Sequence, residues 1–274
     1  MTSLPPVPSW TEFLDLARAP DSIPDGAGRH GDSRWAGASW DEALELAAAG
    51  WTRALPEVDV GIAALRERSG DGLRSTTLLP CWDVTGGEVD VGAYLSGVPE
   101  CMVDAVPSWT SARGRVVTFL VPASCSHTVA HRTIRNRGIA LAALCTAIIE
   151  AGHSVEIWSG FSARVGRERF SAVAKVIPAG EPLDVGRLLF AMAHPAMLRR
   201  LWFGVWDSSA RRSAALLKRS RYGIPHPSRA EDLAEDIADP YVFPNLDRHD
   251  TRWATLDSAR TWCEDLFRGL GLLN

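Results

Sequence analysis

The stretch that decides the fold begins with R-V-V-T-F-L-V at residues 115–121 and continues with P-A-S-C-S-H-T at residues 122–128. The first part is an apolar run rich in β-branched residues, and it is short enough for a buried parallel strand. The second part is a small polar loop of the kind that caps a helix. A helix is expected from about Val129 to Ala151, because Gly152 is a typical helix-ending residue. These residues predict a buried strand that leads into a long helix.

Two more strands are predicted beyond this helix. They are S-V-E-I-W-S at residues 154–159 and F-S-A-V-A-K-V at residues 170–176, and the turn between them lies around residues 164–167. A strand–helix–strand unit of this length requires a parallel crossover, and a parallel sheet is covered on its faces. The predicted fold class is therefore α/β with a mostly parallel sheet.

The overall composition bounds the class of protein. The 274-residue chain can bury one large core or two smaller ones, and its 46% hydrophobic and 23% charged residues are typical of a soluble protein. Its formal net charge of −4 argues against a protein that coats nucleic acid over its whole surface. No apolar run reaches the roughly 18 residues that span a bilayer. The first residues, M-T-S-L-P-P-V-P-S-W, lack the basic start and apolar stretch of a signal peptide, so a cytosolic protein without a membrane partner is expected.

Composition also divides the chain into an acidic helical N-terminal segment, residues 1–74, and an α/β core, residues 75–274, packed as one unit. Ser39 and Glu42 form a capping-box pattern at the start of a helix in the first segment. Residues 73–107 combine a strand candidate with many turn residues, and they are expected to form an ordered loop that lies across the sheet. The later elements are expected to be a helix over 182–200, a strand over 201–207, helices over 209–221 and 228–238, a strand over 241–246 and a helix over 256–268.

This order of elements, with an antiparallel hairpin after the first helix, resembles the von Willebrand factor A-type (vWA) domain, a three-layer Rossmannoid fold. In that family a D-x-S-x-S loop after the first strand holds a divalent cation. The loop here is P-A-S-C-S, in which Ser124 and Ser126 match and proline replaces the acid. Asp207 stands where the family has a later acidic ligand. Because Mg²⁺ prefers several oxygen ligands with carboxylates among them, the resemblance implies a degenerate site that binds Mg²⁺ weakly or not at all. No other cofactor is expected.

Four further stretches are V-D-V-G-A-Y-L-S-G-V-P-E-C-M (89–102), R-N-R-G-I-A-L-A-A-L (135–144), A-G-H-S-V-E-I-W (151–158) and W-A-T-L-D-S-A-R-T-W (253–262). In these stretches the chain resembles an uncharacterised family of bacteriophage and actinobacterial proteins that has no assigned activity. This resemblance implies a protein in the cytoplasm of a bacterial host or associated with a virion. The eleven tryptophans and the loop before Gly37 leave self-association open.

Motifs for catalysis are weak. His127 and His131 have the spacing of metalloprotease ligands, but Thr128 stands where those enzymes have a glutamate base, so two helix-capping histidines are expected. Ser124, Cys125 and His127 are too close in sequence to form a catalytic triad, since triads are assembled from distant elements. An alternative use of this loop is an anion site, because free N–H groups at a helix start attract phosphate or carboxylate. The five cysteines contain no C-x-x-C pair, so reduced thiols are expected.

Acidic side chains gather in the segment 83–104. A solvated face is the plain interpretation, and an enzyme that uses these acids in a deep pocket is a third hypothesis. No phosphate-binding glycine motif is present. The acidic residues are Asp83, Glu88, Asp90, Glu100 and Asp104.

Basic side chains gather between residues 199 and 221, where seven positive charges against Asp207 alone give +6. With Trp202, Trp206 and Tyr222 interleaved, such a face suits the backbone and bases of a nucleic acid. The alternative is that these side chains pair with the acidic N-terminal segment or with a partner subunit. The basic residues are Arg199, Arg200, Arg211, Arg212, Lys218, Arg219 and Arg221.

Taken together, the sequence predicts a non-catalytic accessory or assembly protein that binds another macromolecule through loops at the carboxyl edge of its sheet. Ser124, Ser126 and Asp207 are the expected contact, and a protein is the expected partner. The alternative is a nucleic-acid-binding protein that uses the basic segment Arg199–Arg221. No residue is assigned a catalytic role.

Overall fold

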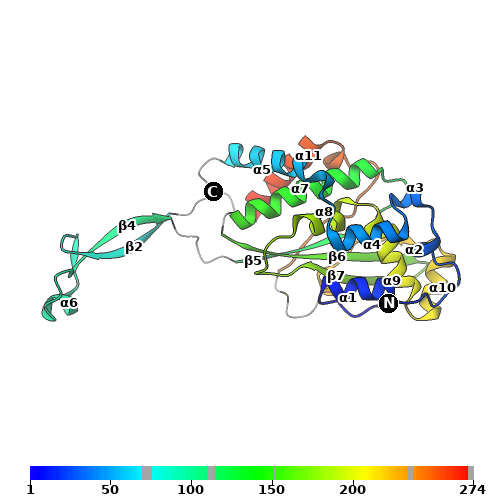
Figure 1. Ribbon diagram of the computed structural model, residues 1–274, viewed down its shortest axis with the longest axis horizontal. Coiled ribbons are helices and arrows are strands. Elements are labelled where there is room, and N and C mark those ends of the chain that lie inside the picture. The colour runs from blue at the N-terminus through cyan, green and yellow to red at the C-terminus, as the bar shows by residue number, and fades with distance from the viewer. Residues whose placement is uncertain (70–75, 110–114, 151, 234–236, 238, 271–274) are drawn as a thin grey trace.

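A six-stranded mixed sheet forms the centre of the computed structural model (Figure 1). The strand order is β1-β7-β6-β5-β9, and β8 pairs with the end of β6. The pairs β5–β6, β5–β9 and β1–β7 are parallel, whereas β6–β7 and β6–β8 are antiparallel. This confirms an α/β fold with a mainly parallel sheet. The strands are β1 (Thr2–Ser3), β5 (Val116–Pro122), β6 (Ser154–Val165), β7 (Glu168–Ile177), β8 (Ile224–Pro225) and β9 (Tyr241–Val242). The structure describes residues 1–69, 76–109, 115–150, 152–233, 237 and 239–270.

The predicted strand–helix–strand unit is confirmed. Helix α7 (His131–Glu150) connects β5 to the parallel strand β6, and most of its residues from Gly138 onward are buried. It lies beside α5 (Leu55–Ser69) and α11 (Leu256–Gly269) on one face of the sheet (Figure 1). A Cβ atom at Gly138 would lie 2.2 Å from the Cβ of Ala193, so glycine permits the close approach of α7 to α8 (Val185–Ala193). The expected helix end at Ala151 lies outside the described residues.

The N-terminal segment is helical and also contributes to the sheet. Ser39 and Glu42 form the predicted capping box. Residues 21–37 contain two short helices, and Val7 forms a parallel bridge to Ala174 of β7. The described helices of this segment are α1 (Trp10–Arg18), α2 (Ala27–His30), α3 (Ser33–Ala36), α4 (Trp40–Ala49), the 3₁₀ turn η1 (Thr52–Ala54) and α5.

The prediction of a strand over residues 201–207 is wrong. This segment is helical, with a π-helical stretch η3 (Met197–Trp202) that runs into α9 (Phe203–Asp207), and all of its residues are buried. A helix that is apolar on every side carries no periodicity, so a short run such as L-W-F-G-V-W is equally compatible with a buried strand. The following α10 (Arg211–Arg219) matches the expected helix. The remaining elements are the 3₁₀ turns η4 (Ala230–Asp232) and η5 (Thr251–Trp253); residues 234–236 and 238 of the expected helix over 228–238 lie outside the described residues.

The loop expected to lie across the sheet is instead an arm that projects from the body (Figure 1). Residues 76–109, here called the arm, form a three-stranded antiparallel sheet in the order β2-β4-β3. Strand β2 is at an edge, which is where Pro80 is tolerated. The elements of the arm are β2 (Thr76–Asp83), β3 (Glu88–Val89), α6 (Val91–Leu95) and β4 (Met102–Trp109). Among the described residues, none of the helices is long and apolar enough to cross a membrane.

Candidate functional site

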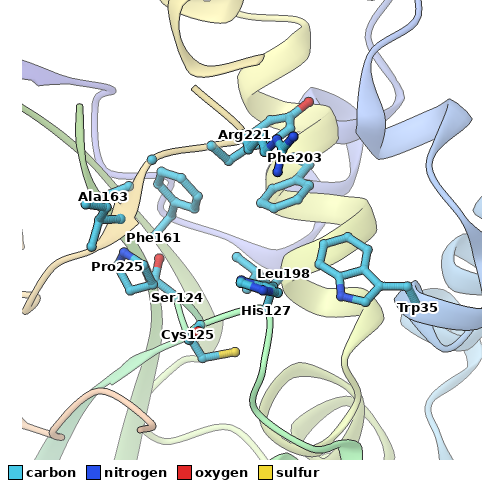
Figure 2. A pocket seen from close by; sticks show the side chains of 14 residues that line it. Trp35, Ser124, Cys125, His127, Phe161, Ala163, Leu198, Phe203, Arg221 and Pro225 are labelled. Carbon is cyan, nitrogen blue, oxygen red and sulfur yellow. The ribbon is translucent and has the colours of Figure 1, made fainter. Parts of the chain in front are cut away.

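A pocket of about 300 Å³ lies just past the carboxyl end of β5 (Figure 2). Its walls come from the β5–α7 loop, β6, the buried helical stretch η3–α9 and the turn after α10. The lining residues are Trp35, Ser124, Cys125, Ser126, His127, Phe161, Ala163, Leu198, Phe203, Arg221, Tyr222, Gly223, Ile224 and Pro225.

Sheet topology explains why a pocket forms at this point. From β5 the chain passes through α7 to β6 on one side, whereas β9 pairs with β5 on the other side. Loops that leave neighbouring strands in opposite directions open a crevice at their carboxyl ends. The loop after β9 reaches the same place, since Leu246 forms a parallel bridge to Cys125. The pocket therefore occupies the edge at which the sequence predicts a binding site.

Aromatic rings form one wall of the pocket. Phe203 and Tyr222 stack with their ring centroids 3.7 Å apart and their planes at 6°. The ring of Trp35 lies 6.2 Å from that of Phe203, and Phe161 faces the same space from β6 (Figure 2). Such a wall buries flat or aliphatic groups of an occupant and discriminates little between them.

The turn after α10 is held in a strained conformation. Arg221, Tyr222 and Gly223 have φ angles of 52°, 62° and 76°, a left-handed region that costs energy for the first two. The Tyr222 hydroxyl donates to Oδ1 of Asp207 at 2.5 Å and accepts the Ala27 N–H at 3.0 Å. These bonds tie the turn to the N-terminal segment, and the turn in turn places Arg221 on the pocket wall.

Asp207 is a structural anchor of this turn. It is completely buried, and its Oδ2 accepts the Gly28 N–H at 3.0 Å. Burial raises the pKa of the Asp207 carboxyl, and the hydrogen bond from Tyr222 partly opposes that rise. Asp207 is absent from the pocket wall, because it ends helix α9 and faces α2 rather than ending a strand.

The structure does not bring Ser124, Ser126 and Asp207 together as one set of ligands. Ser124 is buried, and its Oγ accepts the Ser162 N–H at 2.9 Å. Ser126 Oγ lies 3.0 Å from Thr128 Oγ1 at the exposed side of the loop. In the described part of the chain, no group of three or more His, Cys, Asp and Glu side chains is placed to hold a metal ion.

His127 and His131 do not share a helix face, because α7 begins only at His131. His127 is exposed at the pocket, whereas Nε2 of His131 lies 2.9 Å from Nη1 of Arg199 and 3.0 Å from the Trp35 carbonyl oxygen. Cys125 is buried at the pocket, and burial raises the pKa of its thiol, with Arg199 and Arg137 opposing the rise. A thiol with a raised pKa is protonated at neutral pH and is a poor nucleophile.

The basic segment is only partly a surface. Arg199 and Arg200 are buried, which corrects their expected place on an exposed basic face. Arg199 donates to the Trp35 carbonyl oxygen at 2.6 Å and stacks over the Trp35 ring at 4.5 Å. Arg200 donates to the carbonyl oxygens of Gly28 and Ala38. Both arginines therefore fasten the N-terminal segment to η3, and the sequence could not show this because their acceptors are backbone carbonyl groups.

The rest of the basic segment belongs to α10 and the turn that follows it. Arg211, Arg212, Arg219 and Arg221 are exposed and make no ion pair with any residue that the structure describes. Lys218 instead donates to the Pro24 carbonyl oxygen at 2.5 Å. Trp202 and Trp206 are completely buried, so neither ring is available to stack on a base.

A second candidate surface lies on the arm, where the sequence indicated a possible site only at the acidic residues of segment 83–104 and not at the apolar ones. Residues 82–98, here called the arm tip, carry large apolar side chains that face solvent. The sequence signal was the set of apolar residues in the quoted stretch from Val89 to Met102, most of which are exposed. The exposed side chains are Trp82 (52%), Val84 (60%), Val89 (50%), Val91 (62%), Tyr94 (64%), Leu95 (78%) and Val98 (43%).

Comparison with known proteins places the chain in a family without indicating an activity. No curated protein and no solved structure matches it. One family model does match, and the match extends from residue 1 to residue 274. The protein therefore belongs to the family described as domain of unknown function DUF7192.

Proposed function

We propose that this protein is a non-catalytic assembly protein that binds another protein through its arm tip. The observation that carries the proposal is the concentration of exposed apolar side chains there. Of the twelve exposed large hydrophobic residues in the described part of the chain, seven belong to the arm tip. Contiguous apolar patches on an otherwise ordinary surface mark places where another molecule binds.

The architecture of the arm explains why it needs a partner. The arm is a single layer of sheet, and between residues 81 and 104 no side chain is fully buried. A small sheet needs three or more strands with a hydrophobic face, or packing against a helix, to be stable on its own. An exposed face of that kind favours a partner that covers it. Covering a large apolar side chain contributes about 1.5–3 kcal/mol, so burial of Tyr94 and Leu95 alone is a substantial driving force.

Hydrogen bonds hold the arm tip in shape before any partner binds. Asp90 caps α6 by accepting the Ala93 N–H at 3.0 Å, and its other carboxylate oxygen accepts the Trp82 indole N–H at 3.1 Å. These hydrogen bonds lower the pKa of Asp90, so the cap is charged at neutral pH. A preformed tip loses less conformational entropy on binding than a disordered segment would.

The partner contact expected at Ser124, Ser126 and Asp207 is less suitable. Ser124 and Asp207 are buried and already hydrogen-bonded, which leaves Ser126 alone near the surface. A single hydroxyl provides little binding energy, whereas buried aromatic and aliphatic anchors dominate protein interfaces. We therefore assign the contact to the arm.

Site-specific photo-cross-linking tests this function. A photoreactive amino acid in place of Leu95 is expected to capture a discrete protein in cells that express the full chain. The matched control carries the same amino acid in place of Glu45, an exposed residue of α4, and is expected to capture none. Equal background at the two positions would overturn the proposal.

A second candidate function is nucleic-acid binding through α10. It is favoured by the exposed arginines Arg211, Arg212 and Arg219, which lack ion-pair partners among the described residues. Binding of a fluorescent single-stranded oligonucleotide should weaken steeply between about 50 and 200 mM salt. The Arg211→Glu/Arg212→Glu variant should lose that binding, whereas Arg18→Glu/Arg268→Glu, with the same change in charge elsewhere, should retain it. Equal affinity of the two double variants would exclude α10 as the contact.

A further inference from the structure

The pocket and the arm tip are chemically complementary surfaces. The arm carries five acidic residues and no lysine, arginine or histidine, so its formal charge is −5. Because the whole chain is −4, everything outside the arm sums to +1. The pocket is lined by no acidic residue, and Arg221 is part of its wall. Opposite charge on two surfaces steers their encounter and sets their orientation.

The apolar parts of the two surfaces also match. Tyr94 and Leu95, the two most exposed large apolar side chains of the arm tip, lie next to each other on α6. The pocket offers a space of about 300 Å³ with an aromatic wall, and Ile224 at its rim is 65% exposed. An aromatic or aliphatic anchor seated in a pocket and surrounded by charged rim contacts is the usual arrangement of an interface hot spot.

The arm and the pocket lie at opposite ends of the body (Figure 1). The arm joins the body before the first residue of β5, Val116, whereas the pocket lies beyond its last residue, Pro122. Seven residues of strand separate the two points by roughly 23 Å. The arm also points away from the end of the body that carries α9 and α10 (Figure 1). The arm tip therefore faces away from the pocket of its own chain.

We propose that the arm tip of one copy binds the pocket of a second copy, with Tyr94 and Leu95 as anchors and arm carboxylates facing Arg221. This inference rests on the proposed protein-binding function and names the partner. A contact between two different surfaces of identical chains is head-to-tail, so it leaves one free arm and one free pocket at the ends of every oligomer. As the protein concentration rises, further copies add to these free ends until the oligomer closes into a ring or another molecule covers its ends.

Head-to-tail binding predicts the behaviour of single and mixed variants in sedimentation velocity. The wild-type protein is expected to form larger species as its concentration rises, and added salt should weaken this association. The tip variant, Tyr94→Asp/Leu95→Asp, and the pocket variant, Arg221→Glu/Ile224→Glu, should each stay monomeric. Their mixture should form a one-to-one dimer and nothing larger, because each variant retains one intact surface. Arg221→Glu alone is expected to raise the dissociation constant by about tenfold.

The control changes the same kinds of residue outside both surfaces. Val60→Asp/Arg18→Glu alters an exposed valine of α5 and an exposed arginine of α1, and it should assemble like the wild type. All substituted side chains face solvent, and circular dichroism of each variant verifies folding.

Three results would overturn head-to-tail assembly. They are a wild-type protein that is monomeric at every concentration, a pocket variant that assembles normally, and a mixture that yields no dimer. Each of them leaves the proposed function intact if Leu95 still cross-links to a different protein. Loss of that cross-link as well would overturn both.

Discussion

At the scale of single residues, two buried arginines illustrate how hydrogen-bond partners determine whether a buried charge stabilises the fold. Arg200 donates to Gly28 O, Ala38 O and Ser33 Oγ, at 3.1, 3.0 and 2.8 Å. Arg137 is equally buried, but its Nε and Nη1 have no hydrogen-bond partner in the described part of the chain. Burial lowers the pKa of Arg137 to about 10. A buried charge is stabilising only where its hydrogen bonds are satisfied.

The same substitution is therefore expected to have different effects at these two positions. Arg200→Met leaves two carbonyl oxygens without a donor and should reduce the free energy of unfolding by about 3 kcal/mol. Arg137→Met removes a poorly satisfied cation and should be neutral or stabilising. Urea denaturation measures both, and equal losses would contradict the assignment of partners.

His194 makes stability depend on pH. Its ring packs against Phe190 and Trp51, with centroids 5.5 and 5.0 Å away, and its Nδ1 accepts the Ala196 N–H at 3.2 Å. Burial lowers the pKa of His194 from 6.5 to about 4. The folded state therefore contains the neutral ring. The contribution of His194 to the free energy of unfolding is complete above pH 6.5 and is lost as the pH falls through about 4.

Replacement of His194 by glutamine should remove this dependence. The stability advantage of the wild type over His194→Gln is expected to shrink between pH 7 and pH 4 by at most about 3 kcal/mol, and by less where solvent screens the ring. Chemical denaturation at several pH values measures the difference. Parallel pH profiles for the two proteins would show that His194 is not the titrating group.

At the scale of elements, the arm is structurally independent of the body. Strands β2 and β4 pack on each other, and their principal contacts do not include any helix or strand of the body. Replacement of residues 76–109 by a short Gly-Ser linker should leave the free energy of unfolding of the body within about 1 kcal/mol of the wild type. Differential scanning calorimetry and near-UV circular dichroism provide the measurement. A body that fails to fold without the arm would refute this independence.

The sequence was most informative where local chemistry and burial agree. The strand 115–121, its long helix and the hairpin that follows are all predicted, because β-branched runs, a helix-ending glycine and crossover geometry point the same way. The prediction of a strand over residues 201–207 was wrong because a helix that is buried on all sides shows no hydrophobic periodicity. The prediction for the arm was wrong because turn residues and scattered apolar side chains do not show whether a segment packs on its own core or on a partner.

The sequence indicated where in the fold the candidate site lies, but not which residues form it. The loop with Ser124 and Ser126 lies at the pocket, as the strand–helix boundary indicates. Asp207 was assigned to the wrong element, so its side chain faces α2 instead of this loop. Arg199 and Arg200 look like surface charges in sequence, because only the folded chain brings backbone carbonyl groups to them.

At the scale of the whole molecule, the acidic arm and the arginines of α10 lie at opposite ends (Figure 1). The arm holds a charge of −5 and most of the exposed apolar side chains that are described, whereas the opposite end carries the arginines of α10 and the pocket. A molecule with unlike ends favours directional association over random aggregation. The central claim is that the arm is covered by protein when the molecule functions.

Alkylation of the native cysteines tests that claim most directly. Cys81 is exposed on the arm, whereas Cys145 and Cys263 are buried in the body and serve as internal references. Iodoacetamide labelling, read by mass spectrometry, should be several-fold slower at Cys81 in cells that express the chain than in dilute purified protein. Tyr94→Asp/Leu95→Asp should restore fast labelling in cells, and the two reference cysteines should stay unlabelled throughout. Equal labelling of wild-type Cys81 in cells and in dilute solution would contradict a covered arm.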